Sequence, residues 1–103
     1  MLQAPLFRKG DMVTVLPWLS QDIRYSMIST ECPLSVNSEM EALAGRRHQI
    51  VCLEVYRDWD ECYYLFDGDI YWSWVDSMTA EGMRIALYLN LDFDVVSRRR
   101  LTR

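Results

Sequence analysis

The sequence predicts a mainly β fold of short antiparallel strands with one or two helical turns. Apolar and polar residues alternate along several short runs, and turn-forming pairs such as Asp67-Gly68 separate these runs. Half of the 103 residues are apolar and a quarter are charged, a composition typical of a folded protein. A chain of this length supports one core but not two. We therefore expect residues 1–97 to form a single domain and residues 98–103 a basic tail.

The first third of the chain predicts one clear strand. Residues 12–16 follow the β pattern and end at Pro17. The stretch 18–27 contains a weaker alternation, which fits a short strand or an excursion from the sheet. Residues 32–37 contain a proline, a serine and an asparagine, so we expect a loop there.

A short helix is predicted at residues 38–45. The segment begins with Ser38 as a candidate cap and ends at Gly45, two features typical of helix termini. A helix of one or two turns needs packing to be stable. We expect Met40 and Leu43 to supply it by contacting a sheet.

Residues 48–56 and 62–66 predict a hairpin joined by the polar turn 57–61. Pairing Tyr56 with Cys62 defines its register. One face, the expected core, then carries Val51, Leu53, Val55, Tyr63 and Leu65. The other face carries Ile50, Cys52, Tyr56, Cys62, Tyr64 and Phe66 around a lone Glu54. This second face is also apolar, so another element must cover it.

The turn 67–69 returns the chain into a third strand at 70–74, which completes a meander. A single helical turn at 75–78 follows. Residues 85–93 then show the longest alternation in the chain and predict a C-terminal strand, which covers the second face or forms an exposed edge. A helix over part of 79–91 competes with that strand, because Met83, Leu87 and Asn90 fall at helical spacing.

Charge is distributed unevenly along the chain. Residues 1–97 contain fifteen acidic and seven basic side chains, whereas Arg98, Arg99, Arg100 and Arg103 make the end basic. The acidic body disfavours nucleic acid, since the concentrated basic patches are only the tail and Arg46-Arg47. A basic protein, or the nucleic-acid groove of one, is the better match as a partner. The tail itself could bind nucleic acid, dock on an acidic partner or simply solubilise the end.

The sequence contains neither a membrane span nor a signal peptide, so we expect a cytoplasmic protein without membrane contact. The three cysteines, Cys32, Cys52 and Cys62, form no CxxC motif, which disfavours a disulfide framework and a zinc site. Free and mostly buried thiols are the expectation.

Catalytic chemistry has few candidate residues. His48 is the only histidine, and a hydrogen-bonded or solvated side chain beside a turn explains it. A Cys–His dyad would require the fold to bring distant residues together. The spacing of a calcium loop is absent. We expect no enzyme activity, no cofactor and no metal.

Several segments together resemble small Src-homology-3-like (SH3-like) barrels of bacteriophages and mobile elements. The likeness covers residues 6–80 and consists of the Lys9-Gly10-Asp11 turn before Val13-x-Val15, Met40-x-x-Leu43-x-Gly45, the hairpin, and Tyr71-Trp72-x-Trp74 before Met78. It implies an antiparallel barrel of about five strands, closed by glycine corners and bulky plugs. It also implies peptide or protein binding along an aromatic groove, without cofactor or catalytic residue. Residues 17–37 and 79–103 lie outside the pattern.

Aromatic side chains are the first group of candidate partner-binding residues. Trp72 and Trp74 share one face of the predicted third strand, and two such rigid aromatic residues suit a binding surface. The alternative is that one tryptophan fills the barrel and the other shields an edge. Trp18 and Trp59 lie in or beside loops and are harder to bury. We include Trp59, Trp72, Trp74 and Tyr64 in the candidate site.

Acidic turns are the second group. Asp58, Asp60 and Glu61 lie in one turn, and Asp67 and Asp69 lie in the next. The simpler interpretation is that these acidic residues lie in solvated turns. The sharper hypothesis is that these carboxylates, with Asp76 and Glu81, imitate the phosphates of nucleic acid, while Arg46 and Arg47 orient the complex.

These features favour a non-enzymatic protein-binding module, and an inhibitor of a host defence nuclease is its most concrete form. One alternative is an adaptor or assembly subunit, which pairs as a homodimer through the strand at 85–93. The other is a weak nucleic-acid-binding barrel that uses the arginine tail.

Overall fold

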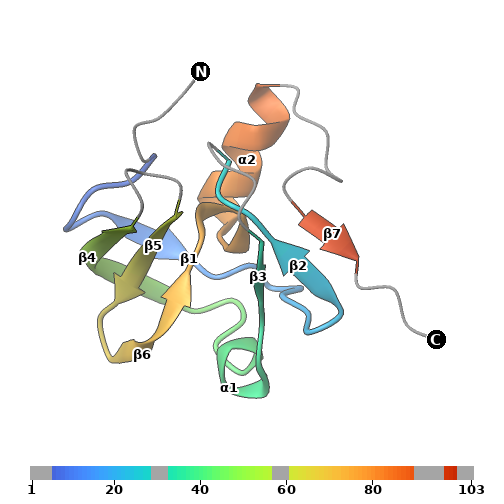
Figure 1. The fold of residues 1–103 in the computed structure, drawn as a ribbon, viewed down its shortest axis with the longest axis horizontal. Coiled ribbons are helices and arrows are strands. Elements are labelled where there is room, and N and C mark those ends of the chain that lie inside the picture. The colour runs from blue at the N-terminus through green and yellow to red at the C-terminus, as the bar shows by residue number, and fades with distance from the viewer. Residues whose placement is uncertain (1–5, 29–32, 57–60, 90–96, 100–103) are drawn as a thin grey trace.

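The computed structural model describes residues 6–28, 33–56, 61–89 and 97–99. It confirms a mainly β protein, with two antiparallel sheets and few helices (Figure 1). The larger sheet contains β1 (Met12–Thr14), β4 (Arg47–Tyr56), β5 (Glu61–Phe66) and β6 (Asp69–Trp74), in that order across the sheet. The smaller sheet has β2 (Ile23–Tyr25) between β3 (Leu34–Ser35) and β7 (Ser97–Arg99). The helices are α1 (Ser38–Glu41), η2 (Asp76–Met78) and α2 (Ala80–Tyr88).

The sheets are not closed into a barrel, so this part of the expectation is wrong. β1 and β6 form opposite edges of the larger sheet. The outer edge of β1 is covered by the chain that enters α2: Val15 pairs with Thr79, and the Thr14 amide donates to Glu81 Oε1 at 2.7 Å. An edge that is already hydrogen-bonded cannot pair with β6.

The strand expected at 85–93 is wrong over its first part, because residues 85–88 belong to α2. The helix begins with a strong cap, since the Thr79 hydroxyl accepts from the Gly82 amide at 2.9 Å. Its buried residues are Gly82, Met83 and Ala86, which recur at helical spacing. The competing helix is therefore correct here, and residues 90–93 lie outside the described residues.

The β4–β5 hairpin is confirmed, but its expected register is wrong by one residue. Val55 pairs with Cys62 and Leu53 with Tyr64, and a β-bulge lies between Ile50 and Cys52. The extra residue of a bulge interrupts the alternation of side chains.

The assignment of the core face of this hairpin is wrong as well. Ile50, Tyr64 and Phe66 are buried in the core, and Cys52 is exposed. Four residues assigned to the core face are only partly buried, namely Val51, Leu53, Tyr63 and Leu65. The side chains of Val55, Tyr56 and Cys62 lie outside those that the structure describes. The face expected to need a cover is thus the one that packs inside.

The short elements agree with the sequence in kind and differ in detail. The single turn predicted at 75–78 is η2, and the weak alternation at 18–27 contains β2. Within the expected loop at 32–37 lies the two-residue strand β3. The cap of α1 is Asn37 and not Ser38, because Asn37 Oδ1 accepts from the Met40 amide at 2.9 Å. Met40 is buried as predicted, and Leu43 packs partly against the core.

Both sheets share one hydrophobic core. Phe66 and Trp74 of the larger sheet stack with ring centroids 4.6 Å apart, and Tyr25 of β2 belongs to the same cluster. α2 stands between the two sheets (Figure 1). It approaches η2 so closely that a Cβ atom on Gly82 would overlap the Asp76 carbonyl oxygen. A glycine is therefore needed at this contact.

The arginines predicted to form a free tail lie partly in a strand. The backbone of Ser97–Arg99 forms β7, which pairs with β2 so that Arg98 is the partner of Arg24. Arg100 and Arg103 lie outside the described residues.

Candidate functional site

Two of the predicted partner-binding residues are buried. Trp74 is fully enclosed against Phe66, and Tyr64 accepts a hydrogen bond from the Phe7 amide at 3.2 Å inside the core. Neither side chain can contact a partner without unfolding of the sheet. Trp74 and Tyr64 therefore do not belong to the candidate partner-binding site. Trp72 is half-buried and its Nε1 donates to Glu39 Oε2 of α1 at 3.3 Å. Trp74 thus fills the core, as in the first part of the alternative named above, and Trp72 packs partly against the core.

The two acidic turns flank β5 in the sequence. The six residues of β5 span about 20 Å at about 3.4 Å per residue. Asp58, Trp59 and Asp60 lie outside the described residues, and only the backbone of Glu61 and Asp69 is described. Phosphate mimicry by a single acidic surface therefore lacks the convergence it needs in the part of the chain that the structure describes.

Two further residues of that hypothesis are engaged elsewhere. Asp76 is fully buried and cannot belong to an acidic surface, which corrects its inclusion. Glu81 accepts hydrogen bonds from the Thr14 amide and from the Thr14 hydroxyl, the latter at 3.1 Å. These contacts stabilise the junction between β1 and α2.

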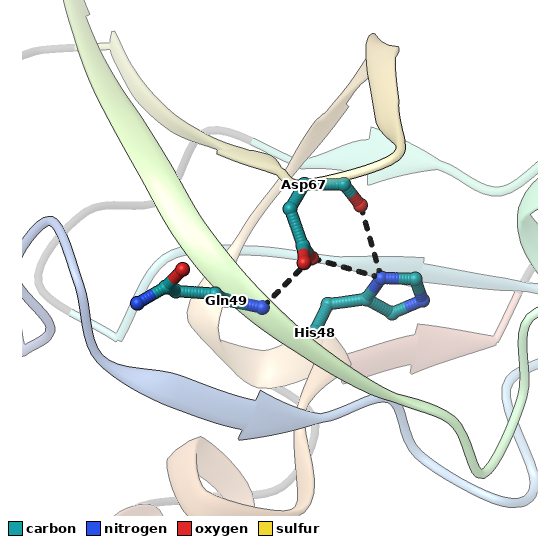
Figure 2. A network of polar contacts seen from close by, with 3 residues as sticks. All are labelled: His48, Gln49 and Asp67. Atoms are coloured by element: carbon teal, nitrogen blue, oxygen red, sulfur yellow. Dashed lines mark hydrogen bonds and ion pairs between the residues drawn. The ribbon is translucent and has the colours of Figure 1, made fainter.

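Asp67 has a structural role in the turn between β5 and β6 (Figure 2). Its Oδ1 accepts from the Gln49 amide at 2.9 Å and lies 3.3 Å from His48 Nδ1, which also contacts the Asp67 carbonyl oxygen at 3.2 Å. The His48 ring stacks on Phe66 with centroids 5.5 Å apart. These contacts attach the start of β4 to the turn, as expected for a hydrogen-bonded histidine. Arg46 and Arg47 are exposed immediately before this network.

The two most exposed large apolar side chains in the described part of the chain, Leu87 and Tyr88, lie at the end of α2. Leu87 is 71% exposed, Tyr88 is 88% exposed and Leu89 is 42% exposed. Arg84 is also exposed, and residues three and four apart are neighbours on a helix. We call Arg84, Leu87 and Tyr88 the α2 outer face. Met83 and Ala86 pack into the core.

Sequence reasoning missed this face because it treated these residues as a strand. The signal for a helix is present in the sequence, since Met83, Leu87 and Asn90 fall at helical spacing. Two other large apolar residues are exposed, Trp18 at 61% and Met12 at 44%. Trp18 thus confirms that a tryptophan beside a loop is hard to bury. Met12 belongs to β1, which packs against α2.

The described residues offer no metal site and no membrane-spanning helix, and Cys52 is their free thiol. No three His, Cys, Asp or Glu side chains there lie close enough to hold a metal ion. No helix in the described ranges has the length and apolarity required to cross a bilayer. Cys52 is a free, exposed thiol, which corrects the expectation of burial for this cysteine. Cys32 and the side chain of Cys62 lie outside the described part.

No family model, no curated protein and no solved structure matches this chain. Known proteins therefore neither confirm nor refute the likeness to SH3-like barrels. The function has to be inferred from the geometry of the described residues, and first from the α2 outer face.

Proposed function

We propose that this protein is a protein-binding module whose main contact is the α2 outer face. The observation that carries the proposal is the exposure of two consecutive large apolar residues, Leu87 and Tyr88, on a well-anchored helix. Single apolar residues are common on protein surfaces, whereas larger exposed apolar patches mark interaction sites. Tyrosine and arginine, which the face also contains, are the residue types enriched at binding hot spots.

The spacing of the face suits a helix that docks into a groove. Arg84, Leu87 and Tyr88 are at positions i, i+3 and i+4, the pattern by which helical segments present anchors. The partner would offer an apolar pocket to Leu87 and Tyr88 and a carboxylate to Arg84. The charge of Arg84 thus requires an acidic group on the partner, although this protein as a whole is itself acidic.

The helix is held firmly enough to present this face. Its start is capped by Thr79, its inner side packs through Met83 and Ala86, and Glu81 binds Thr14 of β1. A rigid surface loses less conformational entropy on binding than a mobile one does.

The biological setting belongs to the same proposal. A cytoplasmic protein of phage or mobile-element type, with an SH3-like larger sheet, would act by occupying a host protein such as a defence nuclease. Its support is the small acidic chain, the Lys9-Gly10-Asp11 turn before β1, and the helical turn η2 after β6. Arg46, Arg47, Trp72 and Asp67 are then secondary contacts.

The test is photo-crosslinking from position 88 in host cells, combined with capture on the tagged full chain. Leu87→Glu is the variant, and Arg24→Glu, an exposed charge change on β2, is the matched control. We expect one protein to crosslink from position 88, to survive nuclease treatment, and to be lost from Leu87→Glu only. Equal capture by both variants would overturn the proposal.

Two other outcomes would point to a different function. A crosslink to a second copy of the chain, with a dimer in solution that Leu87→Glu dissociates, would favour the adaptor. Loss of all binding on nuclease treatment would favour nucleic acid.

A further inference from the structure

A buried carboxyl group lies where the two sheets meet. Asp76 begins η2, directly after β6, and its side chain is fully enclosed. Asp76 Oδ1 accepts from the Ile28 amide at 2.8 Å, whereas Oδ2 is buried without a hydrogen-bond partner among the described residues. Only half of this carboxyl group is therefore satisfied.

The contact between the sheets involves consecutive residues on both sides. Residues 26–28 directly follow β2, the central strand of the smaller sheet, and we call them the β2 exit. Besides the Ile28 bond, the Asp76 amide donates to the Met27 sulfur at 3.4 Å, and the Ser77 hydroxyl donates to the Ser26 carbonyl oxygen at 2.6 Å. Residues 76 and 77 thus connect the exit of β2 to the larger sheet, and we call this contact the sheet junction.

Among the described residues, the groups that hydrogen-bond to the Asp76 carboxyl group carry no charge. They are the Ile28 amide from the β2 exit and the Ser77 amide from η2. The Met27 sulfur and Gly82 of α2, also uncharged, lie against the backbone of Asp76. The charged residues of α2 are directed elsewhere, since Glu81 binds Thr14 and Arg84 is exposed.

An ionised carboxylate at the sheet junction would therefore lack a counterion among the residues that the structure describes. Burying an uncompensated charge costs far more than burying the neutral acid. Burial accordingly raises the pKa of Asp76 from 3.8 to about 7, against a smaller opposite effect of the Ile28 and Ser77 amides.

We propose that Asp76 is a proton-controlled latch: its neutral carboxyl group keeps the β2 exit against η2, and its ionisation loosens the sheet junction. The neutral acid needs no counterion and retains an oxygen that accepts from Ile28. The charged form needs water, which can reach it only if residues 26–28 move away from η2.

The direction of the pH effect follows from the two states of the chain. Below pH 3.8 the group is neutral in both the folded and the unfolded protein, and its contribution to stability is complete. Between pH 3.8 and about 7 the unfolded chain releases this proton while the folded protein keeps it, so the free energy of unfolding falls. Above about pH 7 the group is ionised in both states and the loss stops growing.

The first test is a carbon-13 NMR titration of the aspartate carboxyl groups in the full chain. We expect the Asp76 resonance to titrate at about pH 7. A midpoint near 3.8, the ordinary value, would overturn the proposal. This measurement needs only the wild-type protein, so it stands even if a variant does not fold.

The second test uses Asp76→Asn, a neutral isostere that keeps the oxygen facing Ile28. At pH 8 we expect its urea midpoint to exceed that of the wild type, and the Ile28 amide to exchange with solvent several-fold more slowly than in the wild type. Asp22→Asn makes the same change at an exposed position and should reproduce the wild-type behaviour. A lower midpoint for Asp76→Asn at pH 8 would show that the carboxylate stabilises the fold, and would contradict the latch.

Discussion

The two ends of the segment from η2 to the end of α2 invert the usual distribution of polar and apolar residues. Asp76, Ser77 and Thr79 at its beginning are buried, whereas Leu87 and Tyr88 at its end are exposed. Folded proteins usually hide apolar side chains and expose charged ones. At the beginning of the segment, polar groups therefore make contacts inside the protein. At its end, apolar groups remain available for contacts with a partner.

Both departures depend on how α2 is anchored. The polar end supplies the cap and the contact with η2, and the apolar end projects from that base (Figure 1). Variants along this segment should therefore differ in kind: those at the beginning should affect stability, and those at the end should affect binding.

The largest expected effect is that of Gly82→Ala. A Cβ atom there would overlap the Asp76 carbonyl oxygen, so η2 and α2 would have to move apart. We expect a loss of about 3 kcal/mol in the free energy of unfolding, within the range for overpacked interiors. At an unhindered helical position the same change would stabilise by about 1 kcal/mol, so the sign in a urea titration is decisive.

A smaller loss is expected from Ser77→Ala. The Ser77 hydroxyl donates to the Ser26 carbonyl oxygen at 2.6 Å, and its removal leaves a buried acceptor unpaired. We expect the free energy of unfolding to fall by about 1–3 kcal/mol. Combining this change with Asp76→Asn in a double-mutant cycle should reveal coupling of at least about 0.5 kcal/mol. Strict additivity would mean that the two residues do not act together at the sheet junction.

Thr79→Ala should weaken the start of α2. The Thr79 hydroxyl accepts from the Gly82 amide and donates to the Asp76 carbonyl oxygen at 2.7 Å. Loss of a cap of this type costs about 1–2 kcal/mol, measurable in thermal unfolding. Thr79→Ser keeps the hydroxyl and is the matched control. A serine variant as unstable as the alanine variant would assign the effect to the lost methyl group and not to the cap.

The smallest effect on stability is expected from Tyr88→Ala. The side chain is 88% exposed, so the free energy of unfolding should change by less than about 0.5 kcal/mol. Affinity for the partner should nevertheless fall by about 30-fold or more, as for a hot-spot residue. Isothermal titration with the crosslinked partner would measure this. Unchanged affinity would remove Tyr88 from the contact.

The sequence was sufficient to predict the local elements. The strands of the β4–β5 hairpin, β6 and η2 all follow from alternation and turn chemistry within a few residues. The bulge after Ile50 was not predictable in this way, because no residue type at this position indicates a bulge. The register also differs by one residue at the turn end, where Tyr56 pairs with Glu61. Phe66 stacks on Trp74 in the core, and Tyr64 on the same face of β5 is buried with it.

The candidate site was harder to predict because it depends on distant contacts. The run 85–93 satisfies both a period of two and a helical spacing, and only packing through Met83 and Ala86 selects the helix. In the sequence, Asp76 does not differ from a surface carboxylate. In the fold it is buried against residues 26–28, which are distant in the sequence. The exposure of Trp18 was predictable because it depends on a local loop.

The pairing of β2 with β7 has a consequence for the order of folding. β1, β4, β5 and β6 are joined mostly by neighbouring segments, whereas Ile23 pairs with Arg99 near the other end of the described chain. Bringing such distant residues together requires the closure of a long loop, which slows assembly. We expect the larger sheet to form first and the smaller sheet to be added last, so that rapid-mixing experiments would find late protection of the Tyr25 amide.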